Sequence, residues 1–162
     1  MHHRLSSALL IVAFATAACA TPSGHDGAAH RHAAAQQALE DRRVPVDFPE
    51  PLRSHTLANM RDHLQALGEI QQALSKADYD RAAELAERRL GMSSLQSHGA
   101  HDVARFMPRE MQEAGTAMHR SASQFATVAK DASVSGDLRG ALAALARVNQ
   151  TCVACHAGFR LK

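Results

Sequence analysis

The chain has 162 residues, of which 46% are hydrophobic, and its formal net charge at pH 7 is +2. A charge so close to zero argues against nucleic-acid binding and against a strongly charged docking face. With no Trp, one Tyr and five Phe, the chain is poor in the aromatic residues that sheets favour. Its many Ala and Leu residues predict close-packed helices.

Residues 1–20 are predicted to be an export signal. A short positive start that includes Arg4 is followed by an apolar run from Leu5 to Ala18. The sequence Ala18-Cys19-Ala20 fits the small-x-small pattern of a cleavage site. The apolar run is too short, with the wrong flanks, for a transmembrane helix. We therefore expect an exported protein located in the periplasm.

Cys19 leaves two alternatives open for the mature N-terminus. Cleavage after Ala20 removes the cysteine and releases a soluble protein. Cleavage before Cys19 instead leaves a lipidated N-terminus and a lipid-anchored protein. Thr16, three residues before the cysteine, is a poor match to a lipoprotein signal and favours the soluble form. The composition of residues 21–37 resembles a lipoprotein tether and favours the anchored form.

Residues 21–49 are predicted to be a flexible linker. This stretch is rich in Ala, His and Gly, is then interrupted by Pro45 and Pro49, and has no sustained apolar period. Its histidines are expected to lie in a solvated tail. The folded domain is expected over residues 50–162.

The domain is predicted to contain four helices. The first runs from about Pro49–Arg53 to Ala77, with an apolar line at Leu57, Met60, Leu64, Leu67 and Leu74. The second begins after Asp78, a good N-cap, and ends at Gly91. The third begins at Pro108, after a loop over residues 92–106, and its line includes Met111, Ala114, Met118, Phe125 and Val128.

The fourth helix follows Asp137, which is again a good N-cap. One seam of this helix carries Leu138, Leu142, Leu145, Cys152, His156 and Phe159. Steps of three and four residues, with short connections within helix pairs, are typical of bundles. The sequence therefore predicts an all-α fold, an antiparallel four-helix bundle, and the C-terminal end of its last helix carries a motif that predicts a covalent haem site, Cys152-Val153-Ala154-Cys155-His156.

The haem site is predicted from the motif Cys152-Val153-Ala154-Cys155-His156, which has the C-x-x-C-H spacing of c-type haem attachment. On a helix these three side chains share one face, so both thiols can bond to the haem and the imidazole can reach the iron. A structural zinc site would need a second pair of cysteines. A thioredoxin-like dithiol would follow a strand. Neither context is found.

The motif followed by Ala157-Gly158-Phe159-Arg160, on the last of four helices, resembles the class II cytochromes c. The resemblance covers about residues 51–162. It implies one haem c held by Cys152, Cys155 and His156, with Arg160 close to the haem. Family members often dimerise through their first two helices, so a homodimer is one of the expectations.

In this family the first helix supplies the residue over the distal haem face. Aligning the family's Gly-x-Ile stretch with Gly68-Glu69-Ile70 puts Met60 there. The family's first-helix arginine then falls on Thr56, and Arg53 or Arg61 could take its place beside a haem propionate.

Two functions follow, depending on the sixth iron ligand. If Met60 binds the iron opposite His156, the protein is a closed, low-spin, one-electron carrier between redox partner proteins and is not an enzyme. If Met60 only packs in the core, the iron is five-coordinate and binds NO or CO, as in cytochrome c prime. The donor and acceptor proteins are not indicated by the sequence.

Other histidines are weaker candidates for metal ligands. His63 lies one turn after Met60 but about 60° from the seam on a straight helix. His98 and His101, followed by Met107, form a loop pattern that could bind copper or zinc. Together with the histidines of residues 21–49, this pattern supports a third hypothesis, a periplasmic metal-handling protein.

Overall fold

The computed structural model describes residues 41–162. The predicted export signal, Cys19 and most of the predicted linker lie outside these residues. Within residues 41–162, none of the helices combines the length and the apolar character needed to cross a lipid bilayer.

The described part of the chain is mostly helical, which confirms the predicted all-α class. Its long helices are α2 (Glu50–Ser75), α3 (Tyr79–Arg89), α5 (Arg109–Ser135) and α6 (Leu138–Gly158). The segment between α3 and α5, predicted as a loop, contains a 3₁₀ turn at Met92–Ser94 and the short helix α4 (Ala100–Ala104). Two strands, β1 (Val44–Val46) and β2 (Phe159–Leu161), pair in parallel.

Side-chain caps begin two of these helices where the sequence predicts them. The carboxylate of Asp78 accepts a hydrogen bond from the backbone N–H of Arg81 at 3.2 Å. The carboxylate of Asp137 accepts one from the backbone N–H of Gly140 at 2.9 Å. Each cap satisfies a backbone donor that the helix itself leaves without a partner. At Gly136 the chain adopts a φ of 73°, which ends α5 and turns the chain toward α6.

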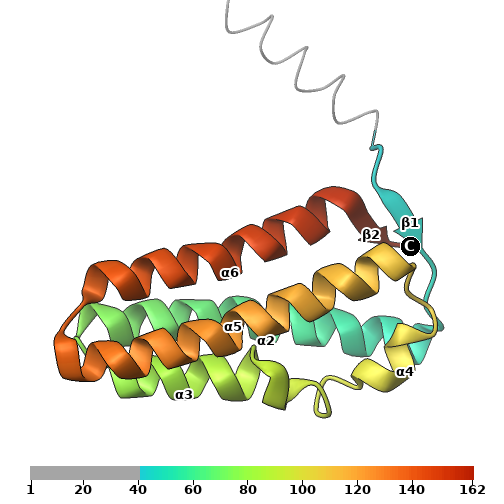
Figure 1. Cartoon of the computed structure of the whole chain (residues 1–162). Helices are drawn as coiled ribbons and strands as arrows, with labels where there is room; N and C mark the ends of the chain where they lie inside the picture. Colours follow the sequence, from blue (N-terminus) through green and yellow to red (C-terminus); the bar gives the residue numbers. More distant parts are fainter. Residues whose placement is uncertain (1–40) are drawn as a thin grey trace, which may run out of the picture. The chain divides into compact units, whose positions relative to one another are not determined.

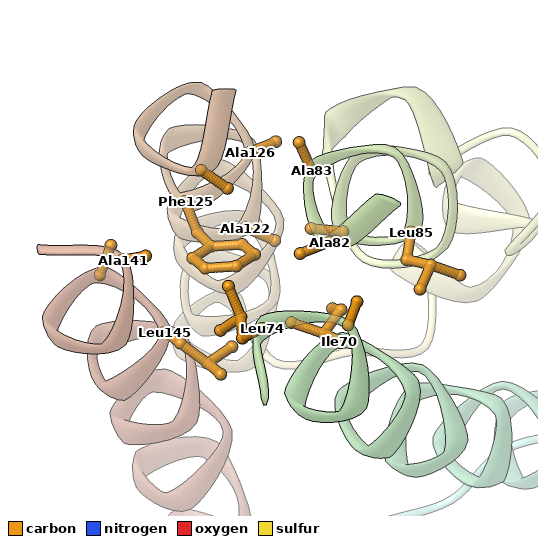
Figure 2. Packing of buried hydrophobic residues seen from close by; sticks show 14 of the residues in the cluster. Ile70, Leu74, Ala82, Ala83, Leu85, Ala122, Phe125, Ala126, Ala141 and Leu145 are labelled. Atoms are coloured by element: carbon orange, nitrogen blue, oxygen red, sulfur yellow. The ribbon is translucent and has the colours of Figure 1, made fainter. Parts of the chain in front are cut away.

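The main core lies between the four long helices, which run side by side (Figure 1). Consecutive helices pack closely: α2 with α3, α3 with α5, and α5 with α6. The core is built around Phe125, Ile70, Leu74 and Leu145 with many alanines between them (Figure 2). Alanine lets helix backbones approach closely, so few large side chains are needed to fill this interior.

A second, smaller core closes the end of the molecule at which α2 begins and α6 ends (Figure 1). Val46, Phe48 and Val103 are buried there, and Met107, Met111, Phe159 and Leu161 pack against them. The prediction of a flexible linker up to residue 49 is therefore wrong at its C-terminal end. Pairing of β1 with β2 incorporates residues 44–48 into the domain, because it satisfies backbone groups and buries two large apolar side chains.

The predicted apolar seams differ from the buried faces. On α2 the buried side chains include Thr56, His63, Ala66 and Ile70, whereas Leu64 is 71% exposed. On α6, Leu138 and Leu142 are also exposed, while Leu145 is buried. The prediction followed the largest apolar residues, but the faces that pack are lined mainly by alanine.

Candidate functional site

The C-x-x-C-H motif, predicted to bind haem, lies in the half of α6 that takes no part in the main core. The first half of the helix contributes four buried residues, Ala141, Ala144, Leu145 and Val148. From residue 149 to residue 158 none is buried. Cys152 and Cys155 are half-buried and His156 is exposed. The motif therefore lies outside the main core, with two half-buried cysteines and one exposed histidine.

The two cysteines are present as thiols rather than as a disulfide. Burial raises the pKa of both Cys152 and Cys155, and the neighbouring Cys155 raises that of Cys152 further. Their spacing of three residues places both on one side of the helix. Thioether bonds to a haem require reduced thiols in this arrangement.

Polar contacts identify the two flanks of α2. Arg89 of α3 donates hydrogen bonds to the carboxylates of Asp62 and Glu69, with a distance of 2.8 Å to Glu69, so this flank faces α3. Arg53 lies on the other flank and donates to the carbonyl oxygen of Lys162, beyond the end of α6. Met60, two turns after Arg53, shares that second flank.

The flank of α2 that carries Met60 is apolar and incompletely covered. Met60 and Leu67 are half-buried and Leu64 is exposed. Leu74, in the last turn of α2, and Leu145, in the first half of α6, belong to the same core cluster (Figure 2). Apart from this cluster, α2 and α6 are not held together by the close packing that joins the consecutive helices. Close packing therefore holds α2 mainly against α3, and α6 mainly against α5.

Met60 also lines a cavity of about 340 Å³ between α2, the segment before α5, and α5 itself. Thr56, His63, His98 and His119 contribute to the same lining, which includes none of the three motif residues. The structure thus does not bring Met60 and His156 together around one cavity. The assignment of Met60 as sixth ligand stays a prediction.

Arg160 lies in β2, where it is in register with Pro45 of β1. It is half-buried and follows the end of α6 rather than lying on the motif face of that helix. The strand pair fixes its backbone, and its expected place near a haem stays a prediction.

A cluster of three histidines was missed by the sequence interpretation. The ring centres of His63 and His98 are 4.8 Å apart, those of His98 and His119 are 5.4 Å apart, and those of His63 and His119 are 6.0 Å apart. His63 and His119 are buried, and His98 is half-buried. His101, which the sequence pattern paired with His98, is instead exposed and contacts Asp102.

Burial makes the three clustered imidazoles hard to protonate. Burial, and to a smaller extent the neighbouring His98 and His119, lower the pKa of His63 to about 4. Burial likewise lowers the pKa of His98 and of His119. All three are neutral at pH 7. A seven-residue spacing of Thr56, His63 and Ile70 along one helix face is the sequence signal that could have placed His63 in the interior.

Comparison of the chain with protein-family models, curated proteins and solved structures gave no match. Among the His, Cys, Asp and Glu side chains of residues 41–162, no group of three or more is arranged, as the side chains lie, so that it could hold a metal ion. Functional conclusions thus depend on the motif, the uncovered half of α6 and the flank of α2.

Proposed function

We propose that the chain is an exported mono-haem c-type cytochrome that carries one electron between redox partner proteins. The observation that carries this proposal is the C-x-x-C-H motif on the half of α6 that the core leaves uncovered. Two thiols and an imidazole at positions i, i+3 and i+4 are the groups that c-type haem attachment needs. We further propose that the four long helices form the antiparallel bundle of the class II cytochromes c.

The residues around the motif fit such a group. Cys152 and Cys155 are thiols on one helix face, and the His156 imidazole is exposed one residue further on. Met60, which is half-buried, and Leu64, which is exposed, offer apolar surface on one flank of α2. A large apolar ring is the kind of ligand that removes such surface from water.

Bound at these residues, a haem supplies an iron that alternates between the ferric and ferrous states. The two thioether sulfurs would hold it permanently, and the His156 imidazole would be its proximal ligand. If the Met60 thioether also bound the iron, it would raise the reduction potential and close the site to small molecules. These roles suit electron transfer rather than substrate chemistry.

A second candidate is a five-coordinate protein that binds NO or CO. It is favoured by the position of Met60, whose cavity is lined by the histidine cluster and not by the motif. If Met60 stays at that cavity, the iron would lack a second protein ligand, and a small neutral gas could bind in its place.

The optical spectrum of the haem-loaded chain tests both candidates. The purified protein should carry the mass of one covalently bound haem, and replacing Cys152 and Cys155 by Ser should remove it. The electron carrier is supported if the reduced protein has a low-spin spectrum and the oxidised protein shows a sulfur-to-iron absorption band. Met60→Ala should then produce a high-spin form that binds CO, while Met111→Ala, in the second core, should leave the spectrum unchanged.

Rapid CO binding by the unsubstituted reduced protein would contradict Met60 ligation and support the gas-binding candidate. A colourless protein whose mass equals that of the polypeptide alone would contradict both.

A further inference from the structure

We propose that His63, His98 and His119 form a second site, independent of the haem motif, that binds a divalent transition-metal ion such as Zn²⁺. The three residues come from α2, from the segment before α4 and from α5. Each lines the cavity of about 340 Å³ described above. Imidazole nitrogen is the ligand that Zn²⁺ and the neighbouring transition metals share.

The spacing of the three rings suits one shared ion. Three imidazoles bound tetrahedrally to zinc have ring centres roughly 5 Å apart, because Zn–N bonds are about 2.0–2.1 Å long. The observed separations are 4.8, 5.4 and 6.0 Å. Buried histidines that only pack do not need to meet as a group of three in this way.

Hydrogen bonds prepare two of the rings as ligands. The hydroxyl of Ser94 donates its single hydrogen to the carbonyl oxygen of Gly91 at 2.7 Å. The Ser94 oxygen also lies 3.3 Å from Nδ1 of His98, and in this second contact the ring nitrogen must be the donor. Nδ1 of His119 donates to the carbonyl oxygen of Leu90 at 2.7 Å. Both rings therefore carry hydrogen on Nδ1 and a lone pair on Nε2. A backbone or hydroxyl partner of this kind is typical of metal-bound histidine.

The third ring has a buried nitrogen without a partner. Nε2 of His63 is inaccessible to solvent and makes no hydrogen bond within the described residues, and the residue as a whole is 7% exposed. An unsatisfied buried polar atom is costly, and a metal ion would satisfy it. The pKa of each ring is lowered, so all three are in the neutral form that binds metals.

Small ring rotations would complete the site. As the rings lie, they are inclined to one another by 41° to 86°, and their nitrogens do not yet surround one point. The outer side-chain torsion of histidine is broad, so the ring of His63, whose Nε2 has no hydrogen-bond partner within the described residues, can turn toward the other two while their Nδ1 hydrogen bonds are kept. The cavity leaves space for water as the fourth ligand, as in zinc sites with three protein ligands.

Zinc binding by the haem-loaded mature chain tests this proposal. His25, His30 and His32 are first replaced by Gln in every sample, so that histidines outside the described residues do not contribute. Equilibrium dialysis against Zn²⁺ with metal analysis should show one bound ion per chain. His63→Gln and His98→Gln should each weaken zinc binding by at least roughly 10–100-fold. That is the loss of metal affinity that follows removal of a residue that only hydrogen-bonds to a metal ligand, and removing the ligand itself should cost no less. His101→Gln, a nearby exposed histidine, should leave affinity unchanged.

X-ray absorption at the zinc edge gives a readout that needs no substitution at the cluster. Scattering from three imidazoles supports the site. Absence of bound zinc, zinc with fewer than two imidazoles, or affinity that survives both cluster substitutions would overturn it.

Discussion

Two histidines of this protein, His63 and His156, lie in contrasting environments. His156 is exposed at the end of α6, whereas His63 is buried between two other histidines. Burial of His63 disfavours its charged form, and neither Asp62 nor any other nearby group compensates for the loss of hydration. Asp62 is itself bound by Arg89, which lowers the pKa of that carboxyl. The environment of His63, not its residue type, therefore makes this histidine hard to protonate.

This burial predicts that the metal-free protein loses stability as the pH falls from 7 to 5. The pKa of His63 is about 4 in the folded protein, whereas the ordinary value, which applies to the unfolded chain, is 6.5. The unfolded chain therefore takes up a proton in this interval and the folded chain does not. The free energy of unfolding should fall by roughly 2 kcal/mol from His63 alone. Urea denaturation with a chelator present, followed by circular dichroism at the two pH values, measures it.

The matched variant is His63→Gln, which cannot be protonated. Its loss of stability between pH 7 and pH 5 should be smaller by about the same 2 kcal/mol. His98 and His119 also have lowered pKa values and should account for part of the remaining loss. An equal loss in the variant and in the unsubstituted protein would show that His63 is not the cause.

At the scale of one element, α6 is divided into a half that packs and a half that carries the motif. Leu145 is 3% exposed and belongs to the main core, whereas Leu142, three residues earlier, is 48% exposed. Both lie on the predicted seam, yet only one is buried. Because α6 packs mainly against α5, only a narrow stripe of α6 is covered by another helix. The rest of its surface is left without a helix packed on it.

The two leucines of α6 make a matched pair for substitution. Leu145→Ala should destabilise the protein by about 2–5 kcal/mol, because it removes buried methyl groups and leaves a cavity in the core. Leu142→Ala should cost well under half as much, since much of its side chain is already in water. Thermal and urea unfolding of the two variants measure the difference. Equal costs would place Leu142 in the core and contradict the structure.

At the scale of the described domain, its first and last segments close one end together. β1 and β2 come from opposite ends of residues 41–162, and the N–H of Lys162 donates to the carbonyl oxygen of Val46 at 3.0 Å. The second core lies beside this pair. Since β2 directly follows α6, this closure anchors the end of the helix that carries the motif.

Closure of this end predicts that Phe48 contributes to stability although it precedes the first helix. Phe48 is 5% exposed, so Phe48→Ala should cost about 3 kcal/mol. Asp47→Ala, at the exposed neighbouring position, should leave the unfolding midpoint nearly unchanged. Differential scanning calorimetry of both variants measures this. A Phe48→Ala variant as stable as the parent would support the linker that the sequence predicted.

The sequence by itself determined the helical class, the capped starts of two helices and the spacing of the haem motif. These features depend on residues within one or two turns of one another, such as Asp137 with Gly140 or Cys152 with Cys155. Only the tertiary structure decided which helix faces are buried, that Val46 and Phe48 belong to the domain, and that three histidines meet. These depend on contacts between residues distant in sequence. An alanine-lined interior gives little hydrophobic signal to locate them, because small side chains bury little area each.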